Sequence, residues 1–488
     1  MHIESSTAPT ISPKPNLWNQ LTTLGRPFWM VNIMEMFERL AYYGVRMVIP
    51  IYIAQADEPL GLHFTQIEKG TIFLVWALVQ SLVPMISGGF ADRYGFKKTI
   101  AASVAIKVVG YLLMATQREF YPFLFGCCVL AFGTGTFKPG VQGTMCQSMH
   151  RENSSVGWGA FYMLVNIGGF LGPPLAHFLY GISWPAVFYG CAAIVSLNFV
   201  MLLTYKDPHS GGDKTGGPLQ ILKITAKNLM NARLTIFILI MSGFWLMLMQ
   251  LFDMMPNFIV DWVDSSKLVT DLNLPSWMLQ YNTERGTQVA QEWLLNANGG
   301  LIVVSVLFIS KLVARMRRVI SISLGTALAS LGLLLAGYTT SGYICLMGIL
   351  VFSVGEMLAS PKMNDYLGVI APAGQKGLYM GYANIPWAIG WGIGSFWAGQ
   401  VYDKLGDKAN LALRYLSDNF QITGVERTEA MNKLMEVTGM NAVDATNLLW
   451  DIYDPYKLWY QFAAVGIASA IAMIFYARWV RRHESADA

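Results

Sequence analysis

Charged side chains occupy the middle of an apolar segment near the start of the chain. They are Glu35, Glu38, Arg39 and Arg46, with Tyr42 and Tyr43 between them. The segment, residues 28–54, is long enough to cross a bilayer as one helix. A charge at membrane depth costs about 2.5–3.5 kcal/mol on insertion scales, so it needs a partner or a water-filled cavity. Most of these side chains share one helical stripe, which predicts that this face of the helix lines a polar cavity.

These residue types indicate two kinds of chemistry. Burial and a neighbouring cation shift the proton affinity of a carboxylate in opposite directions. Glu35, Glu38 and Arg39 therefore predict proton binding that is linked to the charges around it. A guanidinium binds a carboxylate well because its planar fork donates two parallel hydrogen bonds, so Arg46 predicts an anion-binding position. As an alternative, the buried Arg39–Glu35 pair would only hold helices together.

The composition is that of an all-α polytopic membrane protein. Of the 488 residues, 54% are hydrophobic and 13% are charged, and the mean hydropathy is +0.41. A soluble chain would carry about 25% charged residues. The five cysteines have no metal-binding spacing, and no nucleotide-binding loop or catalytic triad is present. We therefore expect no enzyme, no metal, no nucleic-acid partner and no cofactor beyond a proton gradient.

Hydropathy predicts twelve membrane-spanning helices. Their approximate bounds are 28–54, 67–90, 99–116, 120–146, 156–180, 184–205, 234–260, 293–313, 319–338, 342–361, 377–399 and 457–479. Most Lys and Arg residues between the spans fall on one side, which predicts that both termini are cytoplasmic. The expected location is the plasma membrane, which is the inner membrane in a bacterium.

A stretch that contains Gly, Pro, Ser and Lys divides the chain into halves. We predict a six-helix bundle over 1–205, a cytoplasmic linker over 206–233 and a second six-helix bundle over 234–488. Two such halves favour a central site between them. The second half includes an extracytoplasmic insert at about 400–455, where apolar residues recur at helical spacing between Thr428 and Trp450 and predict small helices.

The loop after the second span carries a recognisable motif. It reads Gly88-Gly-Phe-Ala-Asp92-Arg93-Tyr-Gly95-Phe-Lys97-Lys98. This resembles the cytoplasmic loop signature of the major facilitator superfamily. The resemblance implies the major facilitator fold, with Gly88, Asp92, Arg93 and Gly95 as a gate motif. The small residues would permit a tight turn, and Asp92 would meet a helix end or a basic partner that locks the inward gate.

Further motifs occur in order along both halves. They are Glu35-Met-Phe-Glu38-Arg39-Leu-Ala-Tyr42-Tyr43-Gly44, Gly133-Thr-Gly135-Thr-Phe-Lys138-Pro139, Phe161-Tyr162-Met-Leu-Val-Asn166-Ile-Gly168, Gly355-Glu356-Met-Leu-Ala-Ser360-Pro361, the pair Trp245 and Gln250, and Asn296. Together they resemble the signatures of the proton-coupled oligopeptide transporters within the superfamily.

That resemblance implies proton-driven symport of di- and tripeptides by alternating access. The proton-coupling residues would be Glu35, Glu38, Arg39 and Lys138. The substrate-binding residues would be Arg46 and Lys138 at a cationic end, Glu356 at an anionic end, Asn166 and Asn296 at the peptide amide, Tyr42, Tyr43 and Trp245 around the side chains, and Gln250. The expected partners are a small peptide, protons and the lipid bilayer, and the expected state is a monomer.

The sequence also departs from the family pattern. Met249 stands where the family often has an acidic residue, and Asp253 lies one turn further on the same face. Lys107 adds a charge to the third span, where it would snorkel, pair or extend the cationic site. These changes favour an alternative, namely a transporter of the same fold for nitrate, an amino-acid conjugate or a drug-like acid. A non-transporting receptor is disfavoured, because a scaffold alone does not need buried charges.

Overall fold

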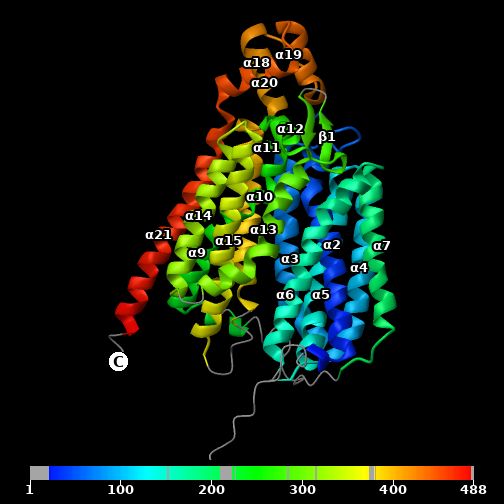
Figure 1. Cartoon of the computed structure of the whole chain (residues 1–488), viewed down its shortest axis with the longest axis vertical. Helices are drawn as coiled ribbons and strands as arrows, with labels where there is room; N and C mark the ends of the chain where they lie inside the picture. The colour runs from blue at the N-terminus through cyan, green and yellow to red at the C-terminus, as the bar shows by residue number, and fades with distance from the viewer. Residues whose placement is uncertain are drawn as a thin grey trace, which may run out of the picture.

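The computed structural model describes residues 21–150, 153–208, 223–225, 227–282, 285–313, 316–372, 379 and 381–484. It is a bundle of long helices with a group of short helices at one end (Figure 1). The short helices come from the predicted insert, and we call their end of the molecule the capped end. The fold class is thus a polytopic all-α membrane protein, as the composition predicts.

The first half of the chain forms a bundle of six long helices. These are α2 (Arg26–Ala54), α3 (Gln66–Tyr94), α4 (Phe96–Thr116), α5 (Phe120–Gln147), α6 (Ser154–Tyr180) and α7 (Trp184–Leu202). Helix α3 begins with the capping box that its sequence predicts: Glu68 donates its backbone N–H to Thr65 Oγ1 at 3.1 Å, and Glu68 Oε2 accepts from the Thr65 N–H at 2.8 Å. This exchange satisfies two backbone donors at the helix start.

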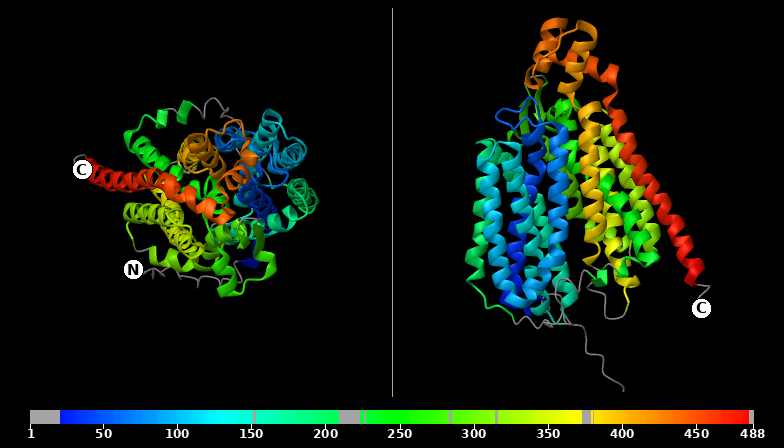
Figure 2. Two further views of the ribbon diagram at one scale, coloured as in Figure 1. Left: turned by 90° about the horizontal axis from the view of Figure 1, so that it is seen from above. Right: turned by 180° about the vertical axis from the view of Figure 1, so that it is seen from behind.

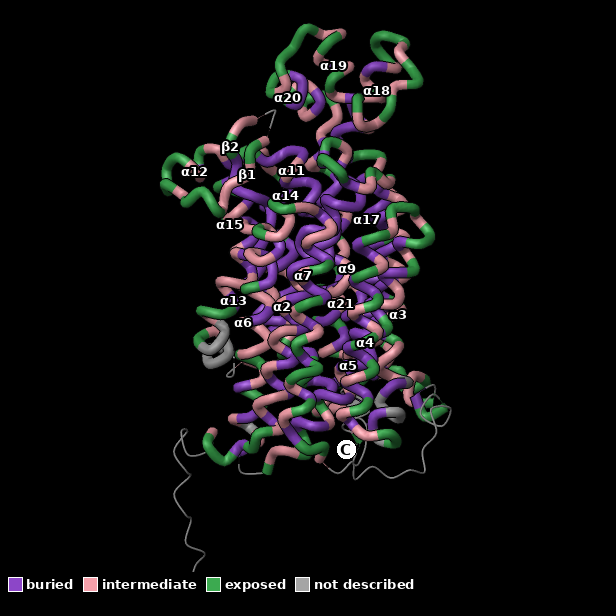
Figure 3. The backbone as a smooth tube through the Cα atoms, turned by 90° about the vertical axis from the view of Figure 1, so that its right-hand side faces the viewer, coloured by how far each residue is buried: buried purple, intermediate pink, exposed green. Residues whose placement is uncertain are grey.

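The second half supplies the other bundle. Its helices are α9 (Ala232–Leu248), α10 (Gln250–Asp253), α11 (Met255–Trp262), α13 (Gln291–Val313), α14 (Arg318–Gly337), α15 (Gly342–Ile370), α17 (Asn384–Leu405) and α21 (Leu458–Glu484). Figure 2 shows this bundle beside the first, with α21 running along its outside. Buried residues concentrate along the interior of both bundles, whereas exposed residues are frequent in the cap (Figure 3).

Nine helices in the described part of the chain are long and apolar enough to cross a membrane. Helix α2 is not among them, although it has 29 residues. It carries the buried charges of Glu35, Glu38, Arg39 and Arg46, which lower its apolar character. The count of twelve spans therefore stays a prediction.

The seventh predicted span is not one continuous helix. It is divided into α9, α10 and α11 at Met249 and Met254. Pro256 lies in the first turn of α11, where the missing N–H of a proline is tolerated. The tenth span, α15, continues to Ile370, beyond the predicted end at 361, with Pro361 inside it. The break leaves the carboxylate of Asp253 buried inside the bundle.

The segments at the capped end are short. Helix α12 (Ser266–Leu272), a turn of 3₁₀ helix (Ser276–Met278) and the antiparallel strands β1 (Leu279–Asn282) and β2 (Gly286–Val289) precede α13. The hairpin was not expected from the sequence. The insert contains α18 (Lys408–Phe420), a 3₁₀ turn (Arg427–Glu429), α19 (Ala430–Thr438), α20 (Ala442–Tyr453) and a 3₁₀ turn (Pro455–Lys457). The small helices predicted between Thr428 and Trp450 are confirmed as α19 and α20, whereas α18 lies before that stretch and was not predicted.

The turn between α3 and α4 falls on the predicted gate motif. Gly95 has a φ angle of +98°, a backbone conformation that residues with a side chain rarely adopt. A Cβ at this position would lie 2.8 Å from Asp207 Oδ2. The glycine is therefore needed for both the backbone angle and the close approach. The side chain of Asp92 and the surroundings of Gly88 lie outside the described part of the structure, and Arg93 is exposed.

Candidate functional site

A cavity with about 1110 Å³ of empty space lies between the two bundles. Helices α2 and α6 line it from the first bundle, and α9, α10, α13, α15 and α17 line it from the second. Eight polar side chains take part: Tyr42, Tyr43, Arg46, Tyr162, Asn166, Asn296, Asn298 and Glu356. A concave site between bundles, with polar groups converging on it, is the usual place for a small-molecule ligand in such a fold.

Helix α2 brings its charged stripe to this interior, as its periodicity predicts. Arg39, Tyr42 and Arg46 are buried with exposed fractions of 7%, 6% and 2%. Tyr43 packs edge-on against Tyr42, with ring centroids 5.4 Å apart. The hydroxyl of Tyr42 accepts a hydrogen bond from Gln80 Nε2 on α3 at 3.1 Å. The stripe is therefore held in place by contacts on its own bundle.

Arg46 forms an ion pair with Asp253 across the two bundles. Asp253 also accepts from Trp391 Nε1 at 3.1 Å and from the hydroxyl of Ser395, both on α17. The guanidinium of Arg46 lies 4.5 Å from the centroid of the Phe73 ring. Because Asp253 lies in the short α10, the break in the seventh span determines where this carboxylate meets Arg46. A buried pair of this kind is secured by its additional hydrogen bonds.

Glu356 lies on the α15 side of the same cavity. Its Oε2 accepts a hydrogen bond from Asn298 Nδ2 at 3.0 Å, and Asn298 also donates to Ser353 Oγ at 2.9 Å. These contacts orient the carboxyl group without supplying a cation. The cavity thus has a guanidinium on the α2 side and a carboxyl group on the α15 side.

Glu35 and Glu38 form a charge cluster with Arg39. Arg39 Nε lies 3.1 Å from Glu35 Oε1, and its NH2 lies 2.5 Å from Glu38 Oε2. Lys107 joins the cluster from α4, with Nζ 3.7 Å from Glu38 Oε1 and an exposed fraction of 0%. Its position shows pairing rather than snorkelling. The cluster therefore brings two carboxylates and two cations together inside the first bundle.

Gly133 makes room for the Lys107 side chain. A Cβ at Gly133 would lie 2.6 Å from Lys107 Cγ and 3.0 Å from the Lys107 backbone nitrogen. Ser103, on the same helix as Lys107, donates its hydroxyl to the Gly133 carbonyl at 2.7 Å. The small residue thus lets α4 and α5 approach closely enough to bury the lysine.

Lys138 lies on α5 and faces the second bundle. Its Nζ is 5.1 Å from the centroid of the Trp387 ring on α17, and Trp387 lines the cavity. Among the described residues, the ion-pair partners of Glu35 and Glu38 are Arg39 and Lys107, and Lys138 forms no ion pair. A lysine over an aromatic face is held weakly, by about 0.5–2 kcal/mol.

The other predicted binding residues fall into two groups. Asn166, Asn296 and Trp245 line the cavity. Asn166 donates to the Tyr162 carbonyl at 2.7 Å, and Asn296 donates to the Phe170 carbonyl at 3.0 Å. Gln250 does not line the cavity: it is fully buried, and its side chain donates to the Leu246 carbonyl at 2.7 Å.

Sequence reasoning missed Asn298 and Trp387 as cavity residues. Asn298 is two residues after Asn296 on α13, and its role depends on the neighbouring α15, which no local pattern reveals. Trp387 is one of several aromatic residues in its span, and its position depends on α5 of the other bundle. Tyr162 belongs to a motif that was recognised, but its contribution to the cavity was not predicted.

The cavity is covered on the side of the capped end. Lys69 Nζ donates to Asn257 Oδ1 at 2.7 Å, and Gln55 Nε2 donates to Asp261 Oδ1 at 2.8 Å, so both bonds join the bundles. His177 on α6 pairs with Glu292 on α13. These contacts hold the ends of α2, α3 and α6 against the second bundle.

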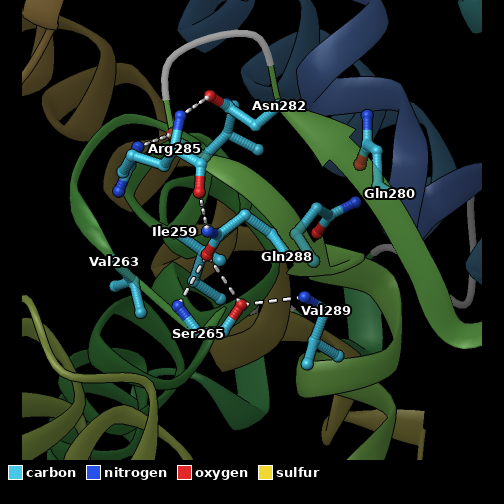
Figure 4. A pocket seen from close by; sticks show the side chains of 10 residues that line it. Ile259, Val263, Ser265, Gln280, Asn282, Arg285, Gln288 and Val289 are labelled. Carbon is cyan, nitrogen blue, oxygen red and sulfur yellow. Dashed lines mark hydrogen bonds between the residues drawn. The ribbon is translucent and has the colours of Figure 1, made fainter. Parts of the chain in front are cut away.

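The insert and the hairpin reinforce this closure. Arg427 lies 2.5 Å from Asp407 Oδ2 and donates to the carbonyl of Ala54, the last residue of α2, at 2.5 Å. Under the hairpin, Arg285 donates to the carbonyl of Asp261 at 2.8 Å. Gln288 Oε1 accepts from the Ser265 N–H at 2.7 Å (Figure 4). The pocket drawn there is small and lies outside the central cavity.

The architecture defines a class: an integral membrane protein with two helical bundles and a charged cavity between them. The family model described as Major Facilitator Superfamily matches residues 31–395, which is most of the chain. The chain belongs to this superfamily. Its members are transporters, so the match agrees with the expectation that this protein is not an enzyme.

Three relatives illustrate the sequence similarity. The uncharacterized transporter YclF of Bacillus subtilis is 30% identical over 145 residues, which is 28% of this chain and 29% of the relative. Dipeptide and tripeptide permease A of Escherichia coli is 28% identical over 202 residues, 40% of this chain and 38% of the permease. Multidrug resistance protein MdtH of Yersinia enterocolitica is 21% identical over 396 residues, 79% of this chain and 89% of MdtH. The chain thus spans less than two fifths of the first two relatives.

Solved structures share the fold. A POT family transporter in complex with a thioalcohol-conjugated peptide superposes with a TM-score of 0.66 at 15% identity, covering 94% of this chain and 99% of that one. A POT family transporter in complex with 5-aminolevulinic acid gives a TM-score of 0.62 at 16% identity, covering 88% and 96%. These matches confirm the major facilitator fold that the motifs predict.

Proposed function

We propose that this protein is a proton-driven symporter of di- and tripeptides that works by alternating access. The observation that carries the proposal is the cavity with Arg46 on one side and Glu356 on the other. A peptide with free termini is a zwitterion, and a selective site needs a cation for its carboxylate and an anion for its amine. The permease similarity and the peptide-bound POT structure support the same substrate class.

The Arg46–Asp253 pair gives this site a mechanism. A substrate carboxylate would compete with Asp253 for the guanidinium, because both are planar acceptors that suit its fork. Since Arg46 and Asp253 belong to different bundles, the exchange would weaken a contact between them. Substrate binding and bundle movement are then linked through one ion pair. Glu356 would receive the peptide amine, with Asn298 holding the carboxyl group in place.

Protons enter this scheme through Glu35, Glu38 and Arg39. The two glutamates share Arg39, and Lys107 also lies near Glu38. Protonating either carboxylate would leave excess positive charge in the cluster. Repulsion by that charge would favour movement of Lys138 towards a substrate carboxylate. The proton gradient is then the energy source, and we assign no other cofactor.

The membrane placement follows from the charge pattern. We place the protein in the plasma membrane, the bacterial inner membrane, as a monomer with both termini in the cytoplasm. Under this assignment the capped end is extracytoplasmic, because the Lys- and Arg-rich helix ends lie opposite to it. The conformation described above is then closed towards the outside.

Competition binding with modified dipeptides tests the proposal. Acetylating the amine and amidating the carboxylate should each cost wild-type protein most of its affinity, because each removes one partner of a charge pair that is desolvated on binding, at roughly 2–5 kcal/mol. Glu356→Gln should weaken binding of the unmodified dipeptide and discriminate less against the acetylated one. Glu436→Gln is the control, because the side chain of Glu436 is 69% exposed in the cap. If acetylation makes no difference to wild type, the peptide assignment fails.

A second candidate is a transporter of the same fold for another anionic or zwitterionic solute. The POT structure with 5-aminolevulinic acid and the buried Lys107 favour it. For a purely anionic solute such as nitrate, only the cationic side of the cavity matters, and Glu356→Gln would be tolerated. Counterflow in proteoliposomes with dipeptides, nitrate, amino-acid conjugates and drug-like acids separates the two candidates.

A further inference from the structure

A second large pocket lies at the end of the molecule opposite to the cap. It has about 1180 Å³ of empty space and is formed by the ends of α9, α14, α15 and α21. Four arginines line it: Arg233, Arg317, Arg318 and Arg481. None of them belongs to the central cavity or to a motif of the proposed transport site, so this pocket needs its own explanation.

The charge of this pocket is strongly positive. Arg317, Arg318 and Arg481 are exposed at its mouth. Arg318 Nε lies 2.7 Å from Asp365 Oδ2, and Lys362 Nζ lies 4.0 Å from the same oxygen. Within the described residues around the pocket, one carboxylate therefore stands against several cations. Such a cluster attracts an anion with several acceptor oxygens, because a guanidinium donates bidentate hydrogen bonds.

The rest of the lining is apolar. Ile320 and Val369 have exposed fractions of 52% and 56% and lie beside the arginines. Deeper in the pocket, the Tyr366 hydroxyl is 2.8 Å from that of Tyr476, which donates to the Arg233 carbonyl at 3.0 Å. An inorganic anion would use only the guanidinium groups. A molecule with a charged head and hydrocarbon chains would use the guanidinium groups and the apolar wall together.

The position of the pocket agrees with such an amphiphile. It is built from the N-terminal ends of α9 and α14 and the C-terminal ends of α15 and α21, all membrane-spanning helices. Helix ends of this kind lie at the level of the lipid headgroups, where anionic lipids and clustered Arg residues attract each other. We propose that the pocket binds an anionic phospholipid, with its phosphate at Arg317, Arg318 and Arg481 and an acyl chain along Ile320 and Val369.

Titration of the full-length protein in detergent tests this site. Phosphatidylglycerol should raise the melting temperature in a saturable manner, and phosphatidylcholine should not. Arg317→Gln and Arg481→Gln should each weaken phosphatidylglycerol binding about fivefold, in keeping with the contribution of one cation near an anionic lipid. The effect should diminish at high salt, because the charges are partly exposed.

Arg478→Gln provides the matched control. Arg478 is exposed on the same helix α21, and its guanidinium lies 5.8 Å from the Phe475 ring rather than in the pocket. Its variant should bind phosphatidylglycerol like wild type. The proposal is overturned if Arg478→Gln weakens binding as much as the pocket variants, if neither pocket variant changes binding, or if inorganic phosphate alone stabilises the protein as well as the lipid does.

Discussion

At the scale of single residues, the Arg46–Asp253 ion pair joins the two bundles through opposite charges. Both side chains have exposed fractions of 2%. Taking a charge out of water costs free energy, and in a buried pair each charge compensates the other. Removing one partner therefore leaves the remaining charge uncompensated. The pair therefore influences both the stability of the closed conformation and access to the guanidinium.

Removing Asp253 alone should be strongly destabilising. Asp253→Asn leaves the Arg46 guanidinium buried without its counter-ion, at a cost of about 3–5 kcal/mol. Transport should fall, and the melting temperature should fall with it. The double variant Arg46→Gln/Asp253→Asn should recover most of the stability without recovering uptake. Thermal unfolding and uptake by the three variants check this, with Asp418→Asn, an exposed carboxylate in the cap, as control. A stable and active Asp253→Asn would contradict the pair's role.

Variants of the carboxylates in the α2 cluster should lose proton coupling while they retain substrate binding. Glu35→Gln or Glu38→Gln removes a protonatable group beside Arg39, so uphill uptake driven by a pH gradient should be abolished. Exchange of substrate at equal pH should persist in part, because the central cavity is intact. Uphill uptake and exchange, both measured in proteoliposomes, test this prediction. Glu119→Gln is the control, because Glu119 is exposed. Should both variants still concentrate substrate, the coupling assignment is wrong.

Residue types and helical period were enough to predict the stripe of α2, because they depend on one segment alone. The partners of that stripe could not be predicted. Lys107 reaches Glu38 from α4, and Asp253 reaches Arg46 from the other bundle. These contacts depend on how separate helices are placed, and a sequence pattern within one helix contains no such information.

At the scale of elements, short segments were harder to predict than long ones. The capping box at Thr65 was recognised because its two residues are local. The break of the seventh span at Met254 was not predicted, although Pro256 two residues later is a local signal for a helix boundary. The β1–β2 hairpin was also missed: its strands have only four residues each, and its closure rests on Gln288 and Ser265.

The loop between α2 and α3 carries a group that should make stability depend on pH. Burial raises the pKa of Glu58 from 4.5 to about 7, the nearby Asp57 and Glu292 carboxylates add to this, and the hydrogen bond from Trp184 Nε1 at 3.0 Å opposes it. The folded protein thus binds more protons than the unfolded chain between about pH 4.5 and 7. The stability that this proton binding provides is complete below pH 4.5 and is lost as the pH rises through about 7.

Glu58→Gln should flatten this dependence. Wild-type protein should lose on the order of 1–3 kcal/mol of stability from this group between pH 4.5 and 8. The variant, which cannot ionise, should lose correspondingly less. Melting temperatures across this pH range measure the difference, and Glu119→Gln, at the same end of the molecule, should behave like wild type. Parallel profiles for wild type and Glu58→Gln would show that another group titrates.

At the scale of the whole molecule, the described contacts correspond to one state of an alternating cycle. Hydrogen bonds such as Gln55–Asp261 and Lys69–Asn257 join the bundles at the capped end. The two-bundle arrangement was predictable from the number of spans and the linker, because hydropathy identifies membrane-spanning helices and the Lys/Arg content of the loops indicates their side of the membrane. Which end is closed could not be predicted, since it depends on side chains that meet across the bundles.

Close packing of α3 against α17 is part of this closure, and it allows a final prediction. A Cβ at Gly70 would lie 2.6 Å from the Ser395 carbonyl oxygen and 3.0 Å from Gly399 Cα, both backbone atoms that cannot easily move. Gly70→Val should therefore penalise the closed state by about 1–3 kcal/mol, the usual cost of overpacking. That cost corresponds to a roughly 5- to 150-fold shift towards a state open at the capped end.

Distances between spin labels measure that shift. Leu60 and Trp277 are exposed at the capped end, with exposed fractions of 73% and 58%, and they lie on the α2–α3 and α12–β1 connections of opposite halves. In Gly70→Val the distance between labels at these positions should lengthen, and uphill transport should fall. Gly159→Val is the control, because a Cβ at Gly159 meets nothing within 4 Å. An unchanged distance in Gly70→Val, together with wild-type transport, would mean that the α3–α17 contact persists throughout the cycle and is not part of the gate.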